Sequence, residues 1–167
     1  MSLLKSVLEN RTKTEHSETR YQRVWFGVNA RVTIGPGFLH KAGFGSVVIP
    51  HPPLVNWLLR LGLPEEARTE LAFAHEFGHF QTAPLFLAYT IVLVLLKVMR
   101  GEGSFLAVFF LLISTQATWE IGSELRAKAA DYQQYRRYYQ SVTPIPRVIF
   151  WTAAIILTVL GWWVAIH

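Results

Sequence analysis

The chain is organised around residues 75–79, which read His75-Glu76-Phe77-Gly78-His79. On a helix, residues four apart lie on one face, so His75 and His79 point the same way and can bind one metal ion. Glu76 lies beside them, where a carboxylate can accept a proton from metal-bound water. Gly78 leaves room for another part of the chain to approach closely. A motif this short needs support from the surrounding sequence, because two helix histidines can also serve ordinary packing.

The composition limits the class of protein and the kind of metal site. The 167 residues suffice for a single domain, and 51% of them are hydrophobic while only 16% are charged. The chain has no cysteine, so a zinc ion would have to be held by histidine and carboxylate. The net charge of +5 is better explained by a membrane than by nucleic acid, because the positive residues border long apolar runs.

Residues 1–82 are expected to form an arm, a small sheet and the motif helix. Residues 1–22 are polar and of mixed charge, which suits a loose arm or a short helix on the membrane surface. Apolar residues alternate over 24–34, with a bend allowed at Gly27, and this predicts a half-buried strand. A second strand is predicted over 44–49. Together the two runs predict a two-stranded antiparallel sheet.

Three apolar segments predict transmembrane helices, namely 83–99, 105–119 and 148–166. A short helix is predicted over 54–61, and Pro64 then opens the motif helix, which continues into the first membrane segment. Pro84 is expected to kink this helix just beyond the motif.

Residues 120–147 are predicted to continue the helix of the second membrane segment, which Pro144 and Pro146 then break. The predicted fold class is therefore a mainly α membrane protein. Residues 1–167 would form one domain, with three transmembrane helices and a small α+β core made of a two-stranded sheet and the motif helix.

The distribution of positive charge predicts the orientation in the membrane. Of the sixteen Lys and Arg residues, only Lys97 and Arg100 lie at the hairpin between the first two membrane segments. The other fourteen lie on the side of the motif, so the positive-inside rule places the N-terminus and the motif in the cytoplasm and His167 outside.

The same hairpin predicts where a third metal ligand lies. Residues equally far from the turn at Gly101–Glu102 have equal height on antiparallel helices, and by this count Glu124 lies level with His79. Glu120 lies one turn closer to the membrane on the same face. One glutamate can therefore bind the metal while the other orients a histidine.

These residues resemble a known group of enzymes. The motif at 75–79, followed on a later helix by Glu124-Leu125-Arg126-Ala127, resembles the gluzincin zinc metallopeptidases. The closest likeness is to their integral-membrane branch, which includes CAAX prenyl endopeptidases and bacterial heat-shock membrane proteases. The resemblance covers roughly residues 44–131.

The resemblance implies roles for individual residues. His75, His79 and Glu124 would bind zinc, and Glu76 would be the general base. Lys128 stands where the family usually has aspartate, so Glu120 stays open as the alternative ligand. An edge strand for binding substrate would consist of Gly45, Ser46, Val47, Val48 and Ile49. Candidates for stabilising the oxyanion are His40, His51, Tyr132 and Arg147.

The sequence therefore predicts a zinc-dependent membrane endopeptidase that acts at the cytoplasmic surface of the bilayer. Its partners would be a peptide or membrane-protein substrate and the lipid bilayer, an oligomer is compatible with the sequence, and nucleic acid is not expected. The alternative is a catalytically silent zinc-binding scaffold or regulatory subunit. The presence of Glu76 favours the enzyme, because a purely structural site needs no base.

Overall fold

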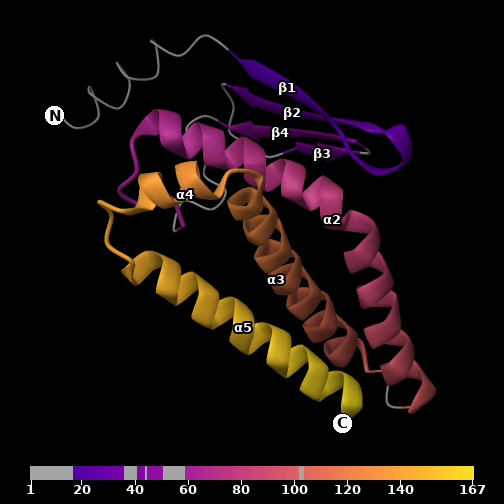
Figure 1. Cartoon of the computed structure of the whole chain (residues 1–167). Coiled ribbons are helices and arrows are strands. Elements are labelled where there is room, and N and C mark those ends of the chain that lie inside the picture. Colours follow the sequence, from indigo (N-terminus) through magenta and orange to yellow (C-terminus); the bar gives the residue numbers. More distant parts are fainter. Residues whose placement is uncertain (1–16, 36–40, 44, 51–58, 102–103) are drawn as a thin grey trace, which may run out of the picture.

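A small sheet is followed by long helices in the computed structural model, which describes residues 17–35, 41–43, 45–50, 59–101 and 104–167 (Figure 1). The elements, in chain order, are β1 (Glu18–Arg23), the 3-10 helix η1 (Trp25–Gly27), β2 (Asn29–Gly35), β3 (Lys41–Gly43), β4 (Ser46–Pro50), α2 (Glu65–Met99), α3 (Phe105–Ala130), α4 (Tyr132–Tyr139) and α5 (Ile145–Ile166). Most of the predicted arm, most of the predicted helix over 54–61, His40 and His51 lie outside the described residues.

The sheet has four strands in the order β1-β2-β4-β3, so the prediction of two strands was wrong. The predicted strand over 24–34 is only partly a strand, because η1 interrupts it and Gly27 has a φ of 81°. The chain reverses at this turn, and β1, which had been assigned to the arm, pairs antiparallel with β2. The predicted antiparallel pairing of the two original runs was also wrong, since β2 and β4 are parallel.

One face of the sheet packs on the first half of α2. In Figure 1 the sheet lies above this helix. The alternating residues Ala30, Val32 and Ile34 of β2 are buried, as their period of two predicts. They form one apolar cluster with Phe73 and Phe77 of α2. The motif helix is therefore anchored to the sheet by the side of the helix that carries Phe77.

Helix α2 runs without interruption from the motif into the apolar segment, as predicted. Pro64 is its N-cap residue, and Glu65 and Glu66 occupy its first turn, where negative charge is favourable. Figure 1 shows that α2 changes direction about midway along its length, and Pro84 lies within the helix. A proline removes one backbone hydrogen bond and crowds the preceding turn, which accounts for a bend there.

The predicted single helix through residues 120–147 was wrong, because α3 ends at Ala130 and a separate helix, α4, follows. Asp131 has a φ of −149° and a ψ of 89°, ends α3, and caps α4 by accepting a hydrogen bond from the backbone N–H of Gln134 at 2.9 Å. Aspartate is a favoured N-cap residue, so the break has a local cause. As a result α4 packs back on the start of α2, with Tyr135 and Tyr139 against Leu63 and Leu71.

Among the described residues three helices, α2, α3 and α5, are long and apolar enough to cross a membrane, as the sequence predicted. In the most apolar window of each helix, only 11–17% of the residues are buried within the molecule. Exposed apolar surface on this scale is typical of a chain covered by lipid or by partners. The end of α5 lies near the hairpin between α2 and α3, while the sheet and α4 lie at the opposite end of the molecule (Figure 1).

Candidate metal centre

Helices α2 and α3 approach each other closely beside the motif. A Cβ atom placed on Gly78 would lie 2.6 Å from the backbone carbonyl oxygen of Ser123, a contact that packed atoms do not make. The role predicted for Gly78, close approach of another segment, is confirmed. This approach brings the glutamates of α3 within reach of the histidines of α2.

Replacing Gly78 by alanine should push α2 and α3 apart and destabilise the protein. The added methyl group meets backbone, which cannot rotate away, and overpacking of this kind costs about 1–3 kcal/mol. We expect a lower melting temperature and weaker metal binding. Gly122→Ala is the matched control, because its Cβ would meet only the ring tip of Phe86, which can move. Equal melting temperatures for the two variants would contradict this account.

Three side chains with potential ligand atoms, those of His75, His79 and Glu120, form a compact triangle between α2 and α3. The Nε2 atom of His75 lies 3.0 Å from Nε2 of His79 and 3.0 Å from Oε2 of Glu120. Nε2 of His79 lies 3.4 Å from Oε1 of Glu120. Among the described residues these three side chains can hold a metal ion, because one ligand atom from each lies within 4.8 Å of the others.

Nitrogen and oxygen ligands of this kind are used by zinc, among other metal ions. In a tetrahedral zinc site with bonds of about 2.0–2.1 Å, neighbouring ligand atoms are about 3.3 Å apart. The two Nε2 atoms are 3.0 Å apart, and they lie 3.0 and 3.4 Å from different oxygens of Glu120, so the group has about the size of such a site. Two imidazole nitrogens and one carboxylate oxygen are also a ligand set that zinc takes in catalytic sites, where the fourth position stays open for water.

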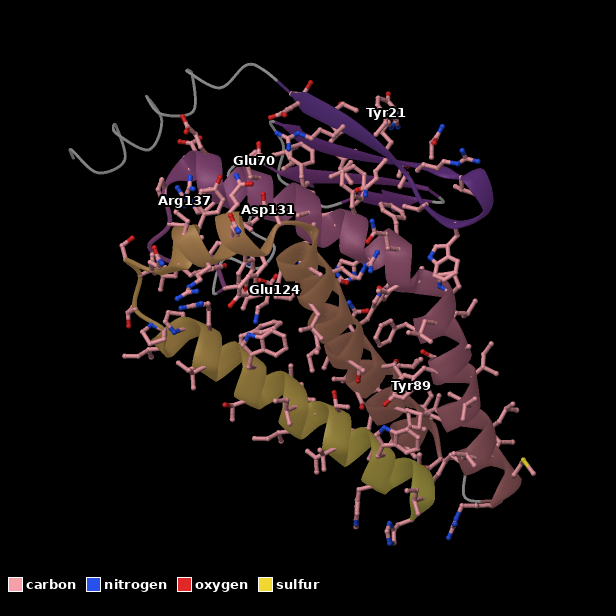
Figure 2. All side chains as sticks on the ribbon, in the orientation of Figure 1. Tyr21, Glu70, Tyr89, Glu124, Asp131 and Arg137 are labelled. Atoms are coloured by element: carbon pink, nitrogen blue, oxygen red, sulfur yellow. The ribbon has the colours of Figure 1, made fainter. Side chains whose placement is uncertain are left out.

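Glu124, labelled on α3 in Figure 2, is not part of the triangle and contacts His75 from the other side of the ring. Its Oε2 atom is 3.0 Å from Nδ1 of His75, the ring nitrogen opposite the one that faces His79. Arg60 donates to both carboxylate oxygens, at 2.8 and 2.7 Å, and the hydroxyl of Tyr135 donates to Oε1 at 2.7 Å. These four contacts occupy the lone pairs of the carboxylate, which leaves none directed at a metal.

The structure therefore favours the alternative that the sequence left open. Glu120 joins the two histidines, whereas Glu124 takes the orienting position behind His75. Residues equally far from the turn have equal height only where both helices are straight. Because α2 bends, the chain needs fewer residues along α3 than along α2 to return from the hairpin to the height of the motif.

The groups around Glu124 are held in fixed protonation states. Burial raises the pKa of Tyr135, and the negative charge of Glu124 raises it further, so the phenol keeps the proton that it donates. Burial lowers the pKa of Arg60, but the charge and hydrogen bonds of Glu124 outweigh burial and leave the pKa above its usual value. The Arg60–Glu124 pair is thus a buried ion pair.

Glu76 is buried on the same stretch of α2, with 5% of its surface exposed. Its carboxylate forms no hydrogen bond with the described residues, whereas both oxygens of Glu124 are hydrogen-bonded.

Trp119 of α3 holds the far side of His79. It donates from its ring N–H to the backbone oxygen of His79 at 3.2 Å and to Thr82 at 3.0 Å. The ring of Trp119 also packs edge-on against that of His79, with centroids 4.9 Å apart.

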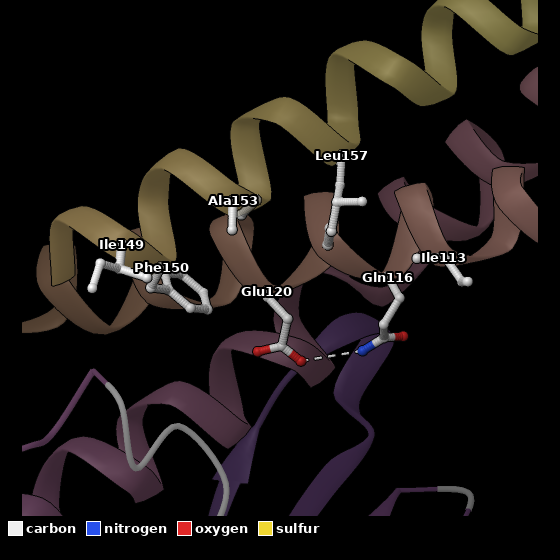
Figure 3. A pocket seen from close by; sticks show the side chains of 9 residues that line it. Ile113, Gln116, Glu120, Ile149, Phe150, Ala153 and Leu157 are labelled. Atoms are coloured by element: carbon white, nitrogen blue, oxygen red, sulfur yellow. Dashed lines mark hydrogen bonds between the residues drawn. The ribbon is translucent and has the colours of Figure 1, made fainter. Parts of the chain in front are cut away.

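An apolar groove between α3 and α5 leads to Glu120 (Figure 3). Its cavity has a volume of about 390 Å³, and its only polar lining residues are Gln116 and Glu120. Gln116 donates to Oε1 of Glu120 at 3.1 Å, which holds this carboxylate at the end of the groove. The groove meets the triangle at Glu120, since neither histidine lines it.

The predicted substrate-binding edge strand, Gly45–Ile49, is corrected by the sheet topology. β4 lies inside the sheet, where β2 pairs with one side and β3 pairs with Ser46, Val47 and Val48 on the other. A peptide can extend a sheet only at a free edge, and along these three residues both edges are occupied.

The described contacts bring neither Tyr132 nor Arg147 to the triangle. Tyr132 is 53% exposed, and the Arg147 guanidinium stacks on the ring of Tyr139 at 4.1 Å. Arg60, Tyr135 and Tyr139 surround Glu124, and no pattern in the sequence indicates them. No spacing rule links Arg60 to a motif fifteen residues later, since only the fold brings the two together.

Comparison with models of protein families finds none that matches the chain, and comparisons with curated proteins and with solved structures find no match either. The likeness to gluzincin metallopeptidases therefore stays a prediction from the residues.

Proposed function

We propose that the protein is a zinc-dependent integral-membrane endopeptidase. The observation that carries the proposal is that the side chains of His75, His79 and Glu120 lie close enough to hold one metal ion. Glu76 of the same motif is buried beside them and forms no hydrogen bond among the described residues. The side chains of the triangle would hold the zinc ion. When bound, zinc polarises a carbonyl and makes water acidic enough to lose a proton near neutral pH.

The residues of the chain then have distinct tasks. Glu76 accepts the proton from the attacking water and passes it to the leaving amine, so that the peptide C–N bond breaks and one water molecule is consumed. Glu124 keeps the proton of His75 on Nδ1 and so leaves Nε2 free to bind the metal. The groove beside Glu120 supports a substrate that is embedded in the membrane or adjacent to it.

Removal of the metal should abolish turnover reversibly. We expect the purified full-length protein to contain about one zinc ion per chain, to lose peptide hydrolysis when dialysed against a chelator, and to regain it when zinc is restored. Metal analysis and hydrolysis of membrane-protein substrates in reconstituted lipid measure the two quantities. Zinc without any turnover would instead support the silent scaffold, and a protein without zinc would refute both functions.

We also propose that the site faces the cytoplasm. Lys97 and Arg100 are the only Lys and Arg residues at the hairpin end, while the sheet and α4 at the other end are rich in them. Reporter fusions should therefore report the N-terminus inside and His167 outside, as the positive-inside rule requires. An N-terminus that reports outside would overturn the orientation.

A further inference from the structure

Arg60 lies in the turn before α2 and is only 2% exposed. Arginine is almost never buried unless its charge is paired, because removing a cation from water is costly. A buried arginine beside a candidate metal centre therefore needs a structural explanation.

The contacts of Arg60 join four parts of the fold at one point. Its guanidinium forms a two-pronged pair with Glu124 of α3, in which Nη1 and Nη2 each donate to a different carboxylate oxygen. Nη1 also donates to the hydroxyl of Tyr139 on α4 at 2.8 Å, and Nη2 lies 3.4 Å from the backbone oxygen of Leu71 on α2. The hydroxyl of Tyr139 in turn donates to the backbone oxygen of Leu59, next to Arg60.

This pairing fixes the orientation of the Glu124 carboxylate. With both oxygens held by the guanidinium and Oε1 held also by Tyr135, the remaining site on Oε2 faces Nδ1 of His75. A carboxylate at this place favours a proton on Nδ1 of His75. Nε2 faces His79 and Oε2 of Glu120, also at 3.0 Å, so any proton that it carries in the metal-free protein is the one that a bound metal ion would replace.

We propose that Arg60 is a positioning residue of the metal centre. By fixing the Glu124 carboxylate, it holds His75 in the tautomer whose Nε2 is free to bind a metal. A lysine cannot replace it fully, because a single ammonium group does not reproduce the two parallel hydrogen bonds of the guanidinium. The metal-binding part rests on the proposed function, whereas the effect on the His75 tautomer does not.

The test uses the full-length protein in lipid nanodiscs with ¹⁵N-labelled histidine. Metal-free Glu120→Ala lacks the carboxylate that competes for the ring proton at Nε2, so at a pH where imidazole is neutral nuclear magnetic resonance should show its His75 protonated on Nδ1. Arg60→Met added to this variant should give a mixture of tautomers, and Arg60→Met in the otherwise unchanged protein should weaken zinc binding by about 10–100-fold. Arg60→Lys should give intermediate results in both measurements. Arg126→Met is the control, since Arg126 is exposed and its Nε donates to Gln81, outside the triangle.

Each outcome decides the proposal. An unchanged tautomer and an unchanged zinc affinity in the folded Arg60→Met variants would overturn it. If Arg60→Met fails to fold, because Glu124 is left buried without its partner, Arg60→Lys keeps the buried charge and its tautomer and affinity decide. If the wild type binds no zinc, the proposed function fails, while the tautomer of metal-free His75 still supports or refutes the role of Arg60.

Discussion

Replacing Glu76 by glutamine should abolish peptide hydrolysis and leave the metal bound. Glutamine has nearly the same shape as glutamate but cannot accept the proton of the attacking water. Loss of a general base typically reduces the rate about 10²–10⁴-fold. Metal binding should persist, because Glu76 is not part of the ligand triangle of His75, His79 and Glu120.

Glu66→Gln is the matched control for this variant. It makes the same chemical change on the same helix, at an exposed position in the first turn of α2. Proteomic comparison of membranes that contain the wild type, Glu76→Gln or Glu66→Gln would also reveal the substrates, which should accumulate only with Glu76→Gln. Hydrolysis by Glu76→Gln at close to the wild-type rate would refute the mechanism.

The long apolar helices and the buried face of β2 could be predicted, because both depend on composition and local pattern. The three apolar helices follow from the length of their hydrophobic runs, and the buried face of β2 follows from the alternation of Ala30, Val32 and Ile34. The four-stranded sheet could not be predicted in the same way. β1 is almost entirely exposed, so its sequence has no apolar alternation, and only its pairing with β2 makes it a strand.

The helix break at Asp131 was not predicted, although aspartate is a favoured N-cap residue. The helical pattern continues on both sides of Asp131, and an aspartate inside such a run is tolerated more often than it ends a helix. The structure uses it as a cap, which turns α4 back toward α2. Through Tyr135 and Tyr139 this reversal supplies two hydroxyl groups to the surroundings of Glu124.

The pairing of His75 with His79 could be predicted from their spacing on one helix, and the structure brings their Nε2 atoms to 3.0 Å. The choice between Glu120 and Glu124 could not, since the two share a face and differ only by one turn. That choice depends on the bend of α2 and on Arg60, which engages Glu124 from a segment outside the helices. Neither feature follows from the spacing of residues along α3.

Alanine substitutions at the two glutamates of α3 should therefore have different effects. Glu120→Ala removes one corner of the triangle, and we expect the purified protein to lose its zinc, with an affinity reduced by more than about 100-fold, yet to remain folded. Glu120 is partly exposed and its remaining contact, with Gln116, lies at the edge of the groove, so little stability depends on it.

Glu124→Ala should mainly affect stability. It leaves Arg60 as a buried cation without its partner, which typically costs about 3–5 kcal/mol, and it removes the acceptor for Nδ1 of His75. Zinc affinity should fall only by the roughly 10–100-fold expected when an orienting group is lost. Thermal unfolding and metal analysis of the two variants separate the roles. If Glu124→Ala loses zinc outright while Glu120→Ala retains it, Glu124 is the third ligand, as the likeness to gluzincins implied.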